Sequence, residues 1–95
     1  MSLTFPAPPT GVDPTTIAVV LFGRDAEAGE DVECRISHNA LIYRCGARGQ
    51  TDGELLRAFN EHREKIEKAA NHKYAAGQVE HLDDRIVVYL ESTDL

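Results

Sequence analysis

The sequence is poor in cysteine and in long apolar runs, and each shortage excludes a class of protein. Its two cysteines, Cys34 and Cys45, do not form a Cys-x-x-Cys pair, and one disulfide is a poor framework for a domain of this size, so we expect two reduced thiols. The longest apolar run, Ile17 to Phe22, is far shorter than the roughly 20 residues that cross a bilayer. The first residues also lack a basic stretch followed by an apolar one, so we expect a cytoplasmic location.

Basic residues are also few, since acidic ones outnumber them and the formal net charge is −6 at pH 7. This charge repels nucleic-acid phosphates and anionic membranes, so we expect neither as a partner. Hydrophobic residues make up 42% of the chain, close to the share in ordinary globular domains. We therefore expect residues 1–95 to form one folded domain, in which residues 1–15 supply a short edge strand and a proline-rich connector.

Three later segments have the composition of strands. Residues 16–22 are apolar at nearly every position and rich in β-branched side chains, which predicts a central strand with both faces covered. Residues 31–36 alternate apolar with charged side chains, which predicts a strand with one solvated face. The polar segment 23–29, bounded by glycines, is typical of a hairpin connection between them. Residues 85–91 alternate again and predict a last strand.

Two helices are predicted between these strands. Ser37 has the side chain of a helix N-cap, and Gly46 suits a left-handed end to the short helix that follows. Thr51 and Glu54 then form a capping-box pattern, in which each side chain accepts a hydrogen bond from the other residue's backbone N–H. A long helix over residues 52–76 is expected to begin there, since its apolar residues recur on one stripe.

Together these segments predict an α+β domain with an antiparallel sheet of three to four strands, in the chain order strand, strand, strand, helix, helix, strand, with one long and one short helix on one face. A helix over residues 52–76 spans about 37 Å, whereas a seven-residue strand spans about 23 Å. We therefore expect the helix to extend past the sheet, where Tyr74, Ala75 and Ala76 need cover and are the candidate interface of a homodimer. The alternative is a break near Asn71 that returns the helix tail to the sheet.

The amino-terminal "LTFP", the helix segment "LLRAFNEHREKIEKAANHKYAAG" at residues 55–77 and Asp94 together resemble domain of unknown function family 1488, a family of short bacterial proteins. The likeness runs over most of the chain. The helix positions that carry it are Leu56, Phe59, His62, Arg63, Ile66, Ala70, Tyr74 and Gly77. The resemblance implies an α+β domain, and because the family has no established activity it supplies no catalytic residues.

His62 and Arg63 interrupt the apolar pattern of the long helix and are candidate binding residues. His62 lies within about 40° of the centre of the apolar stripe, so we expect a largely buried ring that is hydrogen-bonded to sheet or loop backbone; the alternative is a pH-sensitive switch or a general base. Arg63 lies at the edge of the stripe, where its guanidinium would clamp a carboxylate such as Asp94 or the carboxyl terminus; the alternative is a ligand site.

The turn between the helices, "GARG" at residues 46–49, matches the GXXG pattern with which KH domains clamp a nucleic-acid backbone. Arg48 and Thr51, together with the free N–H groups at the start of the long helix, are the candidate residues of such a site. The net charge of −6 and the carboxylates along the long helix argue against this function.

No pattern in the sequence predicts a metal site, a cofactor or a catalytic residue. Cys34, His38 and Cys45 lack the close pair of ligands that structural zinc sites use. Function is therefore predicted in three ranked hypotheses. The first is a non-enzymatic interaction or accessory domain that self-associates through the helix end or a sheet edge; the second is a nucleic-acid or anion-binding module at the GARG loop; the third is an enzyme with a site at His62 and Arg63.

Overall fold

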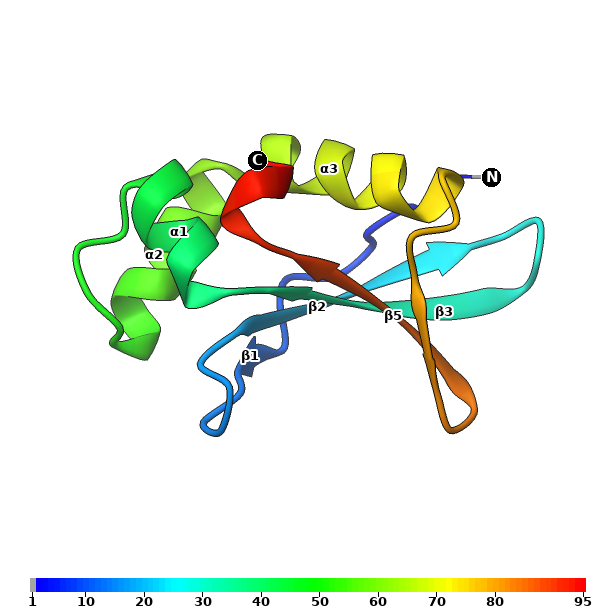
Figure 1. Cartoon of the computed structure of the whole chain (residues 1–95), viewed down its shortest axis with the longest axis horizontal. Coiled ribbons are helices and arrows are strands. Elements are labelled where there is room, and N and C mark those ends of the chain that lie inside the picture. Colours follow the sequence, from blue (N-terminus) through cyan, green and yellow to red (C-terminus); the bar gives the residue numbers. More distant parts are fainter. Residues whose placement is uncertain (1) are drawn as a thin grey trace.

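The computed structural model describes residues 2–95, which form two layers: a sheet and three helices that cover one of its faces (Figure 1). The strands are β1 (Gly11–Val12), β2 (Val19–Asp25), β3 (Glu30–Ile36), β4 (Glu80–Leu82) and β5 (Arg85–Leu90). The helices are α1 (His38–Cys45), α2 (Asp52–Glu61) and α3 (Arg63–Ala75), and a 3-10 turn, η1 (Ser92–Asp94), follows β5. We call the face of the sheet that points away from the helices the open face.

The α+β class is confirmed, but the predicted antiparallel sheet is wrong: five strands of the described chain form a mixed sheet in the order β1-β2-β3-β5-β4. β3 and β5 run parallel, because the chain leaves the sheet after β3, forms all three helices and returns beside β3 in the same direction. The prediction misses β4 because Glu80, His81 and Leu82 are all exposed and lack the apolar alternation that marks a strand.

β2 begins and ends about three residues later than the predicted strand at residues 16–22. Val19 and Leu21 are buried beneath the helices, whereas Phe22 lies on the open face and is 43% exposed. The prediction that both faces of this strand are covered is therefore wrong, because the described helices form a single layer (Figure 1).

The amino-terminal segment forms one antiparallel bridge, between Thr4 and Arg24, in place of the predicted strand at residues 3–5. Leu3 is buried in the core and the Asn71 side chain of α3 is hydrogen-bonded to its backbone, so packing and contacts with α3 rather than a strand ladder hold this segment. The described edge strand on this side is β1, which lies within the predicted connector.

The core lies between the helices and the inner face of the sheet. Alternate residues of β2, β3 and β5 point into it, and for β3 and β5 the alternation of apolar side chains in the sequence predicts this. The fully buried apolar side chains include Leu21, Val32, Ile36, Leu41, Leu55, Phe59, Ile66, Val88 and Leu90. Phe59, in the last turn of α2, is the largest of them.

The predicted long helix is two helices, because the chain breaks at His62. Its backbone lies outside the helical region (φ −119°, ψ 20°), and its N–H group is shared between the carbonyl oxygens of Ala58 (3.2 Å) and Phe59 (3.1 Å). The ring Nδ1 also lies 3.2 Å from the Ala58 carbonyl oxygen, so the side chain caps the end of α2. The break directs α3 along the sheet, where it packs on β5, and removes the predicted overhang (Figure 1).

A buried hydrogen bond joins the end of α3 to the end of β2. The Tyr74 hydroxyl donates to Asp25 Oδ2 (2.6 Å), and Asp25 Oδ1 accepts from the backbone N–H groups of Glu27 (3.1 Å) and Ala28 (3.2 Å). The bond from Tyr74 lowers the pKa of Asp25 and raises the pKa of Tyr74 to about 12. Tyr74 is therefore a structural residue.

Replacing Tyr74 with phenylalanine is expected to lower the free energy of unfolding by about 1–3 kcal/mol at pH 7, because Asp25 Oδ2 then stays buried without a partner. The folded-state pKa of Asp25 lies below its ordinary value of 3.8, so this stabilisation is present above about pH 4 and is lost as the pH falls through the lowered pKa. Urea unfolding at pH 7 and at lower pH measures it. An equal loss at every pH, or the same loss in the exposed control Tyr43→Phe, would contradict this role.

Candidate functional site

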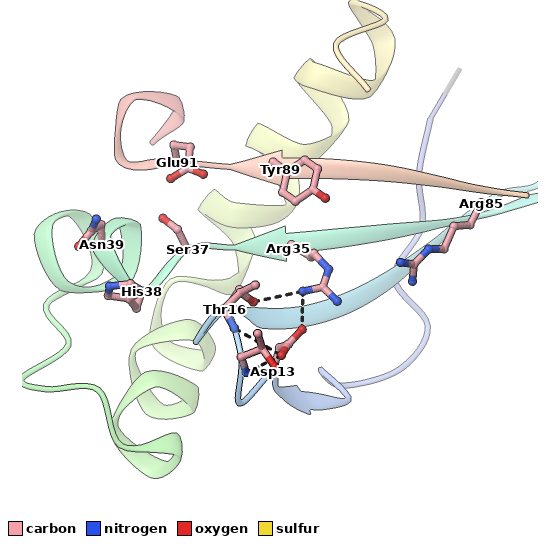
Figure 2. Close-up of a pocket in the computed structure, with 11 residues that line it drawn as sticks. Asp13, Thr16, Arg35, Ser37, His38, Asn39, Arg85, Tyr89 and Glu91 are labelled. Atoms are coloured by element: carbon pink, nitrogen blue, oxygen red, sulfur yellow. Dashed lines mark hydrogen bonds and ion pairs between the residues drawn. The ribbon is translucent and has the colours of Figure 1, made fainter. Parts of the chain in front are cut away.

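The open face is hollowed near the carboxyl ends of β3 and β5 by a cleft of about 660 Å³ (Figure 2). Its walls come from the loop between β1 and β2, the end of β3, the start of α1, and β5. The lining residues are Asp13, Thr15, Thr16, Ala18, Arg35, Ser37, His38, Asn39, Arg85, Tyr89 and Glu91. The volume falls within the roughly 300–1,000 Å³ of small-molecule sites in proteins.

Small residues at the ends of two strands leave room for this cleft. Ala18, just before β2, and Ser37, just after β3, are the smallest lining residues, and Figure 2 shows Ser37 between the larger side chains of His38 and Glu91. Ser37 also starts α1, since its hydroxyl accepts a hydrogen bond from the Ala40 N–H (3.1 Å). The strand therefore turns into the helix at the edge of the cleft, and the first helical residues, His38 and Asn39, line it.

Arg35 ties the β1–β2 loop to β3 and fixes one wall of the cleft. Its Nη1 donates to Asp13 Oδ2 (2.8 Å) and Thr16 Oγ1 (3.3 Å), and its Nε donates to Glu33 Oε2 (2.6 Å). Asp13 Oδ1 also accepts from the backbone N–H of Thr15 (2.8 Å). The hydrogen bond from Arg35, helped by this backbone bond, lowers the pKa of Asp13, so its carboxylate stays ionised at neutral pH.

The same loop contains a strained residue. Ile17 has a φ of 54°, in the left-handed region that β-branched residues rarely adopt. Its side chain packs against the core, its N–H donates to the Asp13 carbonyl oxygen (2.8 Å), and the Asp13 N–H donates to the Ala18 carbonyl oxygen (2.9 Å). These contacts hold the strained loop in place, so this wall of the cleft is formed before any ligand binds.

A buried carboxylate links the two guanidinium groups of the cleft. Glu33 is only 4% exposed although it lies on the open face. Its oxygens accept from Arg35 Nε and, at 2.8 Å, from Arg85 Nη1. The Arg85 side chain is half-exposed, and this is its one hydrogen bond to another described residue. Its other N–H groups are therefore available to a bound molecule.

Other polar groups of the cleft are unused by the described protein. His38 Nδ1 is buried and has no hydrogen-bond partner among residues 2–95. No hydrogen bond joins the Tyr89 hydroxyl or the Asn39 side chain to the other lining residues (Figure 2). A buried polar atom without a partner costs roughly 1–3 kcal/mol, so His38 Nδ1 is a polar atom beside the cleft whose partner the described residues do not supply.

His62, which the sequence singles out, lies outside this cleft. Its ring is half-buried, so the prediction of a largely buried ring is wrong, and the reason is the helix break that turns the ring toward the Ala58 carbonyl. The backbone contact of the ring is with the Ala58 carbonyl of α2, rather than with the sheet or loop backbone that the sequence predicts. The residues around His62 in a shallow surface hollow are Glu61, Glu64, Lys65 and Lys68.

Arg63 clamps two parts of the chain, but not the predicted ones. Its Nη2 donates to the carbonyl oxygens of Phe5 (3.1 Å) and Ala7 (2.8 Å), and its Nε pairs with Glu67 (2.6 Å). The predicted partner, Asp94, is bound instead by a lysine of α3 (3.1 Å). Arg63 therefore attaches the amino-terminal segment to α3.

The GARG loop has carboxylates where an anion would bind. The Thr51 hydroxyl accepts from the Glu54 N–H (3.4 Å) as predicted, but the Glu54 carboxylate accepts from the Arg48 backbone N–H (2.9 Å) and pairs with Arg57. The hydrogen bond from Arg57, with that from Arg48, lowers the pKa of Glu54 to about 2. Asp52 adds a second negative charge at the helix start. The predicted residues therefore lie beside two carboxylates.

The candidate interface at the end of α3 is only partly on the surface. Tyr74 is buried, which leaves Ala75 and Ala76 exposed. None of the residues singled out in the sequence as binding or interface candidates lines the cleft. Of the cleft residues, the sequence draws attention to Ser37, as a helix N-cap, and to His38, as a rejected zinc ligand. The one local signal for the cleft is the small Ser37 between a strand and a helix.

Within residues 2–95, no group of three or more histidine, cysteine or acidic side chains could hold a metal ion. Cys34 and Cys45 are free and buried, and burial raises the pKa of Cys34 to about 12, so its thiol is a poor metal ligand. Among the described helices, none combines the length and the apolar composition that a bilayer crossing requires.

Comparison with known proteins identifies the family. Residues 3–84 match DUF1488, whose description is a protein of unknown function. No curated protein and no solved structure matches the chain significantly. The family match covers everything from the amino-terminal bridge to the β4–β5 turn, including the cleft residues before β5. The chain therefore belongs to the DUF1488 family, as the resemblance in its sequence predicts.

Proposed function

We propose that this protein is a non-enzymatic binding domain whose cleft holds a small polar molecule with hydrogen-bond acceptors and no net negative charge. The observation that carries this proposal is a preformed hollow of about 660 Å³ whose lining keeps unused hydrogen-bond groups. By analogy with open α/β sheets, in which ligands often bind at the carboxyl ends of parallel strands, the position of the cleft at those ends of β3 and β5 supports a binding role.

The charges around the cleft favour a ligand without net negative charge. Two arginines, Arg35 and Arg85, and two carboxylates, Asp13 and Glu91, line the cleft, and the buried Glu33 takes one hydrogen bond from each arginine. The two arginines are thus outnumbered by three carboxylates, and a polyanion such as a nucleic acid gains little there. Arg85 offers N–H donors alone, and the Tyr89 hydroxyl and the Asn39 amide can each donate as well as accept, so a ligand with acceptors can pair with all three.

We propose binding rather than catalysis because the groups of the cleft that could react, Asp13 and Ser37, have structural roles. The pKa of Asp13 is lowered, whereas a general acid or base needs a pKa near the working pH. The Ser37 hydroxyl oxygen caps α1. These residues hold the shape of the cleft.

A matched pair of probes tests this proposal, since succinamide and succinate share a skeleton and differ in charge. Succinamide is expected to bind more tightly than succinate in an NMR titration of the whole protein. Tyr89→Phe should weaken succinamide binding by about 2- to 12-fold, the worth of one hydrogen bond. Tyr43→Phe is the control, because Tyr43 is 74% exposed on α1 and is not a lining residue.

Three results would each argue against the proposal. The first is tighter binding of succinate, which would mean that the cleft recognises an anion. The second is equal binding by the wild type and Tyr89→Phe. The third is a set of shift changes centred on residues 46–49, which would favour the GARG loop as the anion site.

A further inference from the structure

Exposed apolar side chains gather on the open face, beyond the cleft itself. Of the four large apolar side chains that are exposed in residues 2–95, Phe22 (43%), Leu82 (37%) and Tyr89 (38%) belong to strands β2, β4 and β5. Their positions in the strand alternation place all three on the open face. The fourth, Tyr43, is on α1. Three of the four exposed large apolar side chains of the described residues therefore lie on the open face.

The register of the strands joins these side chains into one patch. Phe22 is paired with Glu33, Glu33 with Val87, and Val87 with Glu80, so one row crosses four strands. Val87 is fully buried in this row although no helix covers it. Leu82 and Tyr89 stand in the neighbouring rows on either side. Apolar and charged side chains thus alternate across the face.

The charges of this patch cancel, although the protein as a whole is acidic. On the open face of β2 to β5 the three arginines Arg24, Arg35 and Arg85 meet the three carboxylates Asp31, Glu33 and Glu80. Ion pairs within the face join Arg24 to Asp31 (3.0 Å) and Glu33 to both other arginines. The net charge of −6 is therefore carried by the rest of the chain.

We propose that a second copy of this chain covers the open face, so that two sheets stack face to face in a homodimer. Two copies of an acidic protein repel each other through surfaces that carry its excess of carboxylates, whereas strands β2 to β5 present equal numbers of both charges on the open face. A two-fold interface also has to be self-complementary. A patch that carries apolar side chains and equal numbers of positive and negative ones can meet this condition. A strongly charged partner of another kind would gain no electrostatic attraction here, because the patch has no excess of the opposite charge.

The size of the face suits such a dimer. The molecule measures 37 × 24 × 23 Å, so the outline of a side along its longest axis is large enough to hold the roughly 800 Å² that each partner gives to a standard interface. Stacked sheets lie about 10 Å apart, a distance that Phe22 and Leu82 would fill with their partner's side chains. Phe22 and Val87, at the centre of the patch, do not line the cleft, but Arg35, Arg85 and Tyr89 belong to both, so a ligand in the cleft would lie between the two stacked sheets.

The test is the mass of the whole protein in solution, measured by sedimentation equilibrium from about 1 to 100 µM. The wild type is expected to show twice the monomer mass at the upper end. Phe22→Arg should raise the dissociation constant at least about tenfold, because it adds two like charges to the interface and removes the main apolar contact. Leu82→Lys, in an exposed hairpin strand, should do the same with little risk to the fold.

Tyr43→Arg is the matched control, since it places the same charge on an exposed aromatic position outside the open face. It is expected to leave the dimer unchanged. A wild type that is monomeric throughout this range would overturn the proposal. A dimer that persists in both Phe22→Arg and Leu82→Lys would also overturn it, and so would a dimer that dissociates in Tyr43→Arg. In either case the contact between the two copies would lie outside the open face.

Discussion

Replacing Phe59 with alanine is expected to lower the free energy of unfolding by about 3–5 kcal/mol, which is a large part of the roughly 5–15 kcal/mol that stabilises a typical domain. Phe59 is fully buried and is the largest of the fully buried side chains. It lies in the last turn before the break at His62, where α2 packs on β1 and β2. Its loss leaves a cavity beneath the point at which the two helices meet, and the fold has one layer of helices with which to fill it.

Urea unfolding followed by circular dichroism measures this loss. The control is Tyr43→Ala, which removes an aromatic ring that is 74% exposed and should change the stability by no more than about 0.5 kcal/mol. If Phe59→Ala cost less than about 1 kcal/mol, the packing of α2 on the sheet described above would be wrong.

Replacing Glu33 with alanine is expected to lower the free energy of unfolding by about 3 kcal/mol, even though Glu33 lies on a face that no helix covers. Its carboxylate is 4% exposed and accepts hydrogen bonds from Arg35 Nε (2.6 Å) and Arg85 Nη1 (2.8 Å). Without it, the partly buried Arg35 retains only Asp13 as an ionic partner, and the tie between the β1–β2 loop and the sheet weakens. We also expect the cleft to lose its shape, so that succinamide binding falls in this variant.

Asp31→Ala is the matched control for Glu33→Ala, because Asp31 is on the same strand and face and pairs with Arg24 where both side chains are exposed. Its removal should cost no more than about 1 kcal/mol, and that cost should fall further in 1 M salt. The loss in Glu33→Ala should persist in salt, since the buried pairs are poorly screened. Equal losses in the two variants would contradict the distinction between buried and exposed ion pairs on this face.

The sequence predicts those parts of the fold that neighbouring residues determine. Ser37 begins α1 and Gly46 ends it in a left-handed conformation, as expected, because these signals act within one turn of helix. The alternation in β3 correctly predicts which side chains enter the core. By contrast, the parallel pairing of β3 with β5 depends on where the chain returns after three helices, and no local pattern encodes it.

The candidate site was harder to predict, because its residues come from separated segments. Asp13 and Arg35 look like ordinary surface charges in the sequence, and only the pairing of β1, β2 and β3 brings them together. His62 drew attention because it interrupts an apolar stripe. The structure accounts for that interruption, since the helix ends there and the ring caps it. A residue that interrupts an apolar pattern can thus mark the point where one helix ends and the next begins.

The four histidines of this protein allow one measurement to test the binding role of the cleft directly. The ¹⁵N signals of the imidazole rings of His38, His62, His72 and His81 can be followed by NMR as succinamide is added to the whole protein. Because His38 alone among them lines the cleft and has a buried, unpartnered Nδ1, its ring signals should change with added succinamide while those of the other three stay constant. A change at His62, with none at His38, would contradict the proposal and return the site to the junction of α2 and α3.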